Sequence, residues 1–398
     1  MNDDLSVYLH VPFCRAKCPY CDFYSVRPEQ SPIAPAAYFE LVERELELLV
    51  GHDRRLRDRR VVSLYVGGGT PSLIAPEHYR RFFHRLRGKL DIATPLEWTV
   101  EINPETLVEP DASDRRHRAT SDRFQRFLAL GINRLSIGVQ SFCDATVEQL
   151  GRSHRSDQAR FLLDLVRRHA RSTELLWGID LIFGAPGQTL DLWRADIEQA
   201  LEYRPHHLSV YGLTVHEGTP FAERRRRGEL DLPDEETQRA MFLLARRSLT
   251  RAGYEHYEIA NYALPGMRSR HNERYWTGDD YLGLGAAAHS FVGGVRWANP
   301  SDLALYAESI ESGRLARRIE PSPEGRARVG ELVMLGLRRL EGIDLTRFRA
   351  RWGVDLRKDY APEIDRLTTA GLVEVARGRL RLTDDGLLVA DAVMAEFF

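Results

Sequence analysis

The sequence lacks the features that mark membrane, secreted and nucleic-acid-binding proteins. No apolar run approaches the roughly 20 residues that a transmembrane helix needs, and Met1-Asn2-Asp3-Asp4 lacks the basic flank of a secretion signal. The 56 lysines and arginines face 58 acidic residues, so a net charge of −2 provides no long-range field to attract nucleic acid. We therefore expect a cytoplasmic protein, either free or peripheral at the inner membrane, that binds no nucleic acid.

Cysteine is also scarce, because only 4 of the 398 residues are cysteines. This number disfavours a disulfide framework and fits a reducing compartment. Cys143 stands alone and is expected to be a small buried residue or a residue at the start of a helix. Cys14, Cys18 and Cys21 are spaced C-x3-C-x2-C directly after the apolar run 5–11. A disulfide would leave one of these three thiols unpaired, so the spacing favours a metal site.

Two kinds of metal site suit three closely spaced thiols. A structural zinc ion would need a fourth ligand, for which His10 or a remote histidine is available, but zinc ligands usually come as two separated pairs. A [4Fe–4S] cluster normally takes four thiolates, so three would leave one iron with an open coordination position. The residues favour the cluster and leave open what fills that position.

Six β-rich runs alternate with segments of helical periodicity. The expected strands are 6–11, 61–66, 96–102, 134–139, 178–183 and 207–213, and the clearest helices are 36–50, 77–90 and 234–252. This alternation and the apolar strands predict a parallel sheet covered on both faces. A closed or partly closed barrel of βα units would bring the loops after the strands to one rim. The groups expected there are the cysteine loop, the glycine turn 67–72, Glu101, Gln140 and Asp180.

Two charged segments are expected to be solvated surface. Residues 109–123 are interpreted as an insertion before the helix that follows, and 224–227 form a basic run flanked by Glu223 and Glu229. An anionic partner such as a propionate or phosphate is the minor alternative for the basic run.

The pattern changes toward the C-terminus. Residues 253–289 are rich in polar aromatics, which suit a flat ligand with a polar edge. Helices over 326–340, 345–352 and 361–370 then precede a hairpin that turns at Gly378 and a last helix over 383–398. We expect a barrel over 1–235, an accessory segment over 236–320 and a small winged-helix-like domain over 321–398. Without a basic surface, packing or partner binding is favoured over DNA binding for that last domain.

The cysteine spacing, with Tyr20 before the last cysteine, resembles the signature of radical S-adenosylmethionine (SAM) proteins. Further motifs along nearly the whole chain resemble the oxygen-independent coproporphyrinogen-III-oxidase-like branch: YLHVPFC at 8–14, GGGTPS at 67–72, EINP at 101–104, SIGVQSF at 136–142, LGR at 150–152 and DLIFGAPGQT at 180–189. The resemblance implies an α/β fold, a partial (β/α)6 barrel of the TIM type with an accessory α+β segment and the C-terminal domain. It also implies that SAM chelates the fourth iron.

The resemblance assigns cofactor roles residue by residue. Cys14, Cys18 and Cys21 would hold the [4Fe–4S] cluster. The SAM-binding positions would be Tyr8, Tyr20, Gly68, Gly69, Thr70, Glu101, Gln140, Arg152 and Asp180. Taken alone, a glutamine or aspartate at a strand end is more often an ordinary loop residue, and the glycine turn lacks the lysine of a P-loop. The shared rim and the resemblance together favour SAM binding.

Two members of this branch have different functions. The oxidases decarboxylate two propionates of coproporphyrinogen III with a 5′-deoxyadenosyl radical, and they carry a further cysteine two positions after the third motif cysteine and an N-terminal extension. This sequence has Phe23 at that position, and only thirteen residues precede Cys14. The haem chaperones of the branch share the phenylalanine and an H-N-x-x-Y-W motif, which is present here at 271–276.

The resemblance therefore favours a chaperone that carries haem as cargo and passes it to acceptor haemoproteins, with the oxidase as the alternative. His271 is the candidate axial ligand, and Tyr275 and Trp276 could flank the macrocycle. On sequence alone such a histidine is more often a structural hydrogen-bonding residue, and the same holds for His289. Turnover of SAM and the oligomeric state are left open, with a homodimer as one option.

Overall fold

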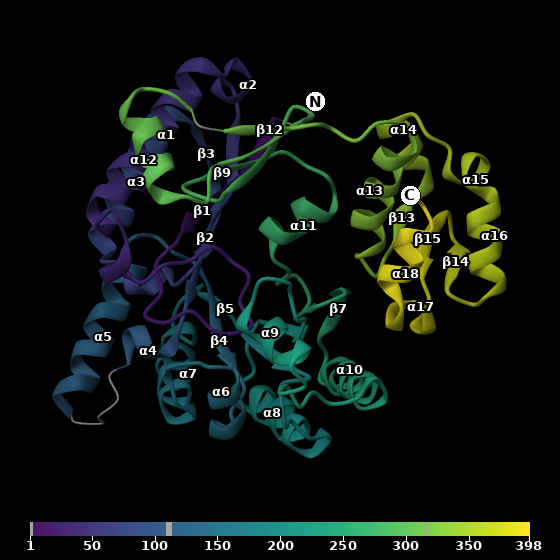
Figure 1. Ribbon diagram of the computed structural model, residues 1–398, viewed down its shortest axis with the longest axis horizontal. Coiled ribbons are helices and arrows are strands. Elements are labelled where there is room, and N and C mark those ends of the chain that lie inside the picture. The colour runs from purple at the N-terminus through teal and green to yellow at the C-terminus, as the bar shows by residue number, and fades with distance from the viewer. Residues whose placement is uncertain (1–2, 109–113, 316) are drawn as a thin grey trace.

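The computed structural model describes residues 3–108, 114–315 and 317–398 (Figure 1). Six strands pair in parallel and in chain order: β1 (Asp4–Val11), β2 (Arg60–Gly68), β3 (Asp91–Ile102), β4 (Arg134–Gln140), β5 (Leu176–Phe183) and β6 (His207–Gly212). Helices follow or separate them: α1 (Pro35–His52), α3 (Pro76–Lys89), α5 (Asp114–Leu128), α7 (Ser156–Ala170), α8 (Leu190–Tyr203) and α10 (Glu235–Arg251). The predicted βα alternation and the partial barrel are confirmed.

Short elements complete the barrel. They are α2 (Arg54–Arg57), α4 (Pro104–Leu107), α6 (Asp144–Gln149), α9 (Pro220–Arg226) and the 3-10 turns Pro28–Gln30 and Pro71–Leu73. Parallel strands buried on both faces must be apolar almost throughout. In β1, for example, Leu5, Val7, Leu9 and Val11 are all fully buried.

The accessory segment extends the sheet at both ends. β9 (Tyr281–Leu284) pairs in parallel with β1, and β10 (His289–Val292), β11 (Val295–Ala298) and β12 (Arg318–Glu320) follow it. On the other side, β8 (Asn261–Ala263) and β7 (Glu255–Glu258) continue from β6 in antiparallel order. Helix α11 (Arg270–Trp276) lies between these two ends (Figure 1), and α12 (Leu303–Glu311) packs against α1. The barrel is therefore flanked on both sides by one continuous stretch of chain.

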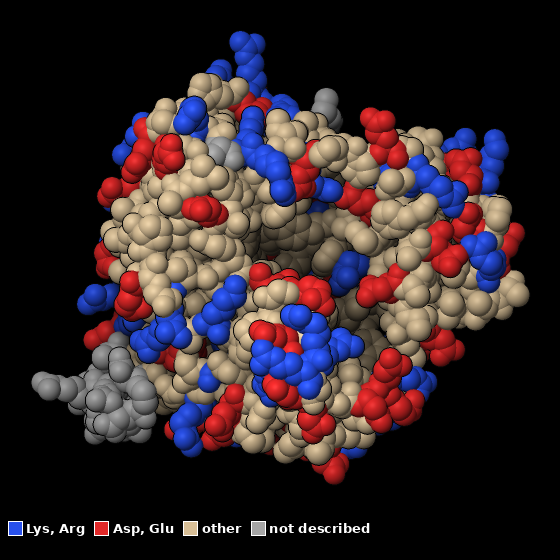
Figure 2. Space-filling view, viewed as in Figure 1, with Lys and Arg blue, Asp and Glu red and all other residues tan. Residues whose placement is uncertain are grey.

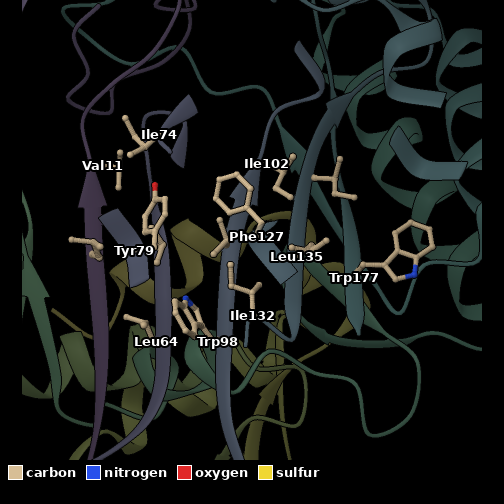
Figure 3. Close-up of a cluster of buried hydrophobic side chains, with 14 of the residues drawn as sticks. Val11, Leu64, Ile74, Tyr79, Trp98, Ile102, Phe127, Ile132, Leu135 and Trp177 are labelled. Atoms are coloured by element: carbon tan, nitrogen blue, oxygen red, sulfur yellow. The ribbon is translucent and has the colours of Figure 1, made fainter. Parts of the chain in front are cut away.

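An apolar core between the strands and their helices fixes the strand ends. Leu64, Trp98 and Leu135 project from neighbouring strands toward Tyr79 of α3 and Phe127 of α5 (Figure 3). Burying a large apolar side chain contributes about 1.5–3 kcal/mol. A core of this size makes the carboxyl ends of the strands a rigid platform.

The C-terminal region has its own apolar core and forms the separate lobe at the right of Figure 1. Its elements are α13 (Gly325–Leu337), β13 (Ile343–Asp344), α14 (Leu345–Trp352), α15 (Leu356–Asp359), α16 (Ala361–Thr369), β14 (Val373–Ala376), β15 (Arg379–Leu382), α17 (Asp384–Leu388) and α18 (Ala390–Ala395). The hairpin β14–β15 turns at Arg377 and Gly378, which have φ of 51° and 76°. The predicted hairpin is confirmed.

Two expectations about helices were wrong. The last helix is not continuous, because Val389, with φ of −127°, separates α17 from α18. The polar segment 109–123 does not precede its helix, since α5 begins at Asp114, and residues 109–113 lie outside the described residues. The segment is also partly packed, because Thr120 is buried and Arg123 donates hydrogen bonds to the carbonyl oxygens of Ser72 and Leu73.

None of the helices in the described ranges combines the length and the apolar composition of a membrane span.

Candidate functional site

A cavity of about 410 Å³ opens at the carboxyl ends of the parallel strands. All three motif cysteines line it, together with residues from the ends of β2 to β6. The structure brings eight of the nine candidate SAM residues to this cavity: Tyr20, Gly68, Gly69, Thr70, Glu101, Gln140, Arg152 and Asp180. Segments that are far apart in the sequence thus share one rim, as expected of a parallel barrel.

The cysteine loop is held by backbone hydrogen bonds and faces hydrogen-bond donors. The amide of Cys14 donates to the carbonyl oxygen of Val26 at 3.1 Å. The hydroxyl of Thr70 lies 3.4 Å from the Cys14 sulfur, and a guanidinium nitrogen of Arg152 lies 3.9 Å from the Cys18 sulfur. Burial raises the pKa of the Cys14 thiol and raises that of Cys21 to about 11. These thiols are protonated near neutral pH, so a metal must displace protons to bind them.

Histidine 10 does not complete a zinc site in this arrangement. Its Nε2 donates to the carbonyl oxygen of Tyr24 at 2.9 Å, and its Nδ1 accepts from the hydroxyl of Tyr8 at 3.1 Å. Burial lowers the pKa of His10 to about 4, so the ring stays neutral. Within the described ranges, no three His, Cys, Asp or Glu side chains surround a point that one ion could occupy. Both ring nitrogens of His10 are engaged, so His10 is not available as a fourth zinc ligand.

The glycine turn packs against the cysteine loop so closely that side chains are excluded. A Cβ atom on Gly68, which has φ of 111°, would lie 2.5 Å from the ring of His10. A Cβ on Gly69 would lie 2.8 Å from the carbonyl oxygens of Val11 and Phe13. The turn therefore presents only backbone to the cavity beside Cys14. A small polar ligand such as the methionine end of SAM fits this cradle.

Two buried carboxyl groups face the cavity. Glu101 accepts hydrogen bonds from the hydroxyl of Tyr65 at 2.8 Å and from the amide of Gly68 at 3.2 Å. Burial raises its pKa to about 7, and the nearby charge of Asp180 adds to this effect. Burial also raises the pKa of Asp180, whose oxygens accept from the hydroxyl of Ser136 at 3.0 and 2.9 Å. Buried carboxyl groups of this kind suit a ligand that carries positive charge and hydroxyl groups.

A buried arginine lies between the carboxyl groups and the cysteine loop. Arg152 donates to the side-chain oxygen of Asn103 at 2.7 Å and to the carbonyl oxygen of Gly138 at 3.3 Å. Its Nε is buried and has no hydrogen-bond partner among the described residues. Close by, Gln140 has φ of 65°, a left-handed conformation that non-glycine residues rarely adopt. Unpaired donors and backbone strain concentrate where a ligand completes the structure.

Several lining residues have no role assigned from the sequence, and one candidate SAM residue lies outside the lining. Tyr65, Ser136 and Tyr211 line the cavity, although none of them was assigned a role from the sequence. Ser136 begins the motif 136–142, whereas only their position near strand ends could have indicated Tyr65 and Tyr211. Tyr8 is not part of the lining. Its ring stacks on Tyr65 at 6.2 Å, and its hydroxyl binds His10.

The H-N-x-x-Y-W motif lies away from this cavity, on α11, and its side chains point in two directions. His271 is buried inside the barrel, where its Nδ1 lies 2.9 Å from the hydroxyl of Ser63 and its Nε2 lies 3.0 Å from that of Tyr275. Because Ser63 donates its proton to Ser6, Nδ1 carries the hydrogen and Nε2 accepts from Tyr275. Burial lowers the pKa of His271 to about 3. Trp276 instead lies at the surface of α11, under the guanidinium of Arg338 at 4.6 Å.

His289 is exposed and lies 3.9 Å from Glu320. Among the described residues, no group of side chains that could hold a metal ion forms around His289.

Comparison with known proteins agrees with this architecture. The profile of the Radical SAM superfamily matches residues 8–200, and that of the HemN C-terminal domain matches residues 324–389. The chain is 31% identical to the Heme chaperone HemW of Lactococcus lactis over 98% of this chain and 97% of that protein. It is also 31% identical to the Heme chaperone HemW of Escherichia coli K12, over 99% and 98% of the two chains. The chain belongs to the HemW family.

The structure of E. coli coproporphyrinogen III oxidase (HemN), described as a radical SAM enzyme, superimposes with a TM-score of 0.81. It covers 100% of this chain and 90% of the oxidase chain at 24% identity, so it shows the shared fold alone. Membership of the radical SAM superfamily implies a [4Fe–4S] cluster and SAM for this HemW-family chain. The cysteine loop, the glycine cradle and the unpaired Arg152 nitrogen fit those two groups.

Proposed function

We propose that this protein binds haem and passes it to acceptor haemoproteins, and that it holds a SAM-liganded [4Fe–4S] cluster. The observation that carries the proposal is the similarity, over nearly the full length of both chains, to proteins named Heme chaperone HemW. The barrel (1–235) would hold the cofactors, and the accessory segment (236–320) and the C-terminal domain (321–398) would handle the cargo. We infer that it acts in the cytoplasm, free or at the inner membrane, with a homodimer as one option.

The residues of the cavity support the cofactor assignment. Cys14, Cys18 and Cys21 would bind three irons, and Arg152 would offset the negative charge that the thiolates bring into a buried site. The SAM-binding residues would be Tyr8, Tyr20, Gly68, Gly69, Thr70, Glu101, Gln140, Arg152 and Asp180. When bound, the cluster and SAM supply one-electron chemistry. The chain's part is to orient SAM against the backbone of the glycine turn and to exclude water from the cavity.

We further propose that His271 ligates the haem iron, with Tyr275 and Trp276 beside the macrocycle. In this structure the Nε2 lone pair of His271 accepts a hydrogen bond from the hydroxyl of Tyr275, so iron must displace this hydrogen bond. The lowered pKa of His271 keeps the ring neutral, which is the form that binds iron. Opening of α11 is therefore a required step of this ligation.

Titration of the purified protein with haem tests this step. Tyr275→Phe removes the competing hydroxyl, so it should tighten haem binding several-fold while the Soret maximum stays in place. His271→Ala should shift the Soret maximum. An unchanged maximum in His271→Ala would remove His271 as the ligand and would leave haem binding itself intact.

Coproporphyrinogen III oxidase activity is the second candidate, favoured by the fold shared with HemN and by the cavity beside the cysteine loop. At the position where the oxidases carry a further cysteine, this chain has Phe23, whose side chain is 62% exposed. An anaerobic assay with reconstituted protein, dithionite, SAM and coproporphyrinogen III decides between the two. The chaperone proposal expects no CO2 or protoporphyrinogen beyond background. Multiple turnovers of coproporphyrinogen III would contradict it.

A further inference from the structure

A second cavity lies where helix α11 meets the C-terminal lobe. It is a groove of about 570 Å³ between the end of α11 and the elements α13, β13 and α14. Figure 2 shows the molecular surface hollowed between the barrel lobe and the C-terminal lobe. The apolar residues that line the groove are Trp276, Leu332, Leu335, Ile343, Phe348, Ala350 and Trp352. Two indole rings and a phenyl ring give this lining the shape and polarity that flat apolar ligands prefer.

The edge of the groove carries an excess of positive charge. Its charged lining residues are Arg339, Arg347, Arg351, Arg379, Glu341 and Asp344. Arg339 and Arg379 both pair with Glu341, so a single carboxylate serves two guanidinium groups. The side chain of Arg347 is 88% exposed, and its nearest carboxylate, that of Asp344, is 3.9 Å away. Guanidinium groups that share a carboxylate or lack a close one bind the carboxylates of a ligand well.

The walls of the groove are fixed against each other. Arg351 of α14 donates to the carbonyl oxygens of Thr277 and Gly278, each at 3.0 Å, and to the carboxylate of Asp279 at 2.9 Å. Trp276 is half-buried, and its indole N–H is buried without a hydrogen-bond partner among the described residues. An indole donor without a partner, at the edge of a formed groove, is a second sign that a ligand completes this region.

We propose that this groove binds a porphyrin dicarboxylate, which is the macrocycle of the haem cargo. The groove would bind the ring whether or not it contains iron. The proposal rests on the haem function proposed above and names where the cargo first binds. The macrocycle would pack on the aromatic floor while its propionates pair with the arginines at the edge. The described residues that line the groove include no histidine, cysteine or methionine, which are the usual axial ligands of haem iron, so the groove is suited to the ring rather than to the iron.

The groove also accounts for the divided orientation of the H-N-x-x-Y-W motif. Its tryptophan reaches the groove, whereas its histidine points into the barrel. Ring recognition at Trp276 would then come first, and iron ligation at His271 would follow once α11 has opened and brought the two side chains to the same macrocycle.

Metal-free protoporphyrin IX is the probe, because it has the ring and both propionates but no iron. Its binding to the full-length protein can be followed by fluorescence titration. Arg347→Glu should weaken binding about three- to five-fold, as expected for one exposed ion pair. Trp276→Ala should weaken it about ten-fold through the loss of an aromatic contact. The control is Arg349→Glu on the same helix, because Arg349 is exposed and contacts Asp355 rather than the groove.

The dimethyl ester of the porphyrin should bind the wild type more weakly than the free acid does. The ester and the free acid should bind Arg347→Glu with equal affinity. If Arg347→Glu and Arg349→Glu bind protoporphyrin with equal affinity, and circular dichroism shows that both are folded, the groove is not the porphyrin site. Haem binding without any binding of metal-free porphyrin would also overturn it and would leave the chaperone proposal standing. Porphyrin binding that responds to Arg347, combined with no haem transfer to any apo-haemoprotein, would instead remove the chaperone function and keep the groove.

Discussion

One tyrosine connects the two candidate sites at the scale of single residues. The ring of Tyr65 lies 5.1 Å from the ring of His271, and its hydroxyl donates to Glu101 in the cofactor cavity. Hydrogen bonds continue from His271 into the barrel interior, first to Ser63 and then to Ser6. A shift of Glu101 on SAM binding would therefore reach His271 through a single packed ring. This contact gives SAM a physical route by which to influence the H-N-x-x-Y-W motif.

Glu101 should make SAM binding dependent on pH. Its pKa of about 7 lies above the ordinary value because burial disfavours the carboxylate. The sulfonium of SAM favours the ionised form, so affinity should be full above pH 7 and fall about ten-fold per pH unit below it. Equilibrium dialysis of SAM against the reconstituted protein between pH 5.5 and 8 measures this slope.

Glu101→Gln is the matched variant, because glutamine keeps the acceptor for Tyr65 but does not ionise. Its SAM affinity should be weaker above pH 7 and nearly flat across the same range. A Glu101→Gln protein that keeps the wild-type slope would assign the titration to another group and contradict the prediction.

At the scale of elements, the turn after β4 depends on a buried carboxyl group from α8. Asp196 accepts hydrogen bonds from the hydroxyl of Ser141 at 2.8 Å and from the amide of Phe142 at 2.7 Å. These bonds fix the chain directly after Gln140, whose backbone is left-handed. The energy that holds this strained residue at the cavity therefore comes from a helix behind the sheet.

Asp196→Asn should lower the free energy of unfolding by about 1–3 kcal/mol, because an amide has only one oxygen for two donors. Burial raises the pKa of Asp196 to about 6, so its contribution is full near pH 4 and is lost as the pH rises through 6. The difference between wild type and variant in urea denaturation should narrow from pH 5 to pH 8. Glu198→Gln, at an exposed position on the same helix, should change little, and an equal loss there would refute the role of Asp196.

The strands of the barrel could be predicted from the sequence, but several other elements could not. Long apolar runs such as β5 have a local signal, since both faces of the sheet are buried. The strands β8 to β12 have only three or four residues each and exist because an existing sheet edge offers them hydrogen bonds. The break at Val389 likewise depends on tertiary packing, because no glycine or proline marks it.

The cofactor cavity was predictable because motif residues follow parallel strands, which must end at one rim. The environment of His271 was not, because its partner Ser63 lies 208 positions away in the sequence. The groove was equally hidden, since Trp276 and Phe348 line one cavity only when the two lobes dock. Spacing therefore identifies residues that share a loop or a rim and gives no access to contacts between lobes.

At the scale of the whole molecule, two separate apolar cores meet through an interface that combines the packing of Ile259 on the C-terminal core with several polar contacts. The amide of Ile259 donates to the carbonyl oxygen of Arg338 at 3.1 Å, and the amide of Leu340 donates to that of Tyr257 at 3.1 Å. Glu258 is fully buried at this interface, 3.7 Å from the guanidinium of Arg338, and burial raises its pKa. Polar contacts across such an interface are weaker than a continuous apolar core. The hydrogen bonds of Arg351 therefore help to hold the C-terminal lobe against α11, and their loss is expected to let the lobe move.

Arg351→Met should increase this motion, because it removes three hydrogen bonds to the residues that follow α11 while keeping an unbranched side chain. Arg351 is partly exposed, so the cost should be about 1 kcal/mol. Hydrogen exchange should then quicken about five-fold in peptides that cover 270–280 and 345–352, and it should stay unchanged in the barrel strands. Arg349→Met is the control, because Arg349 pairs with Asp355 of its own lobe. If both variants exchange alike, Arg351 does not hold the lobes together, and the groove between them must be fixed by the backbone hydrogen bonds of Ile259 and Leu340 instead.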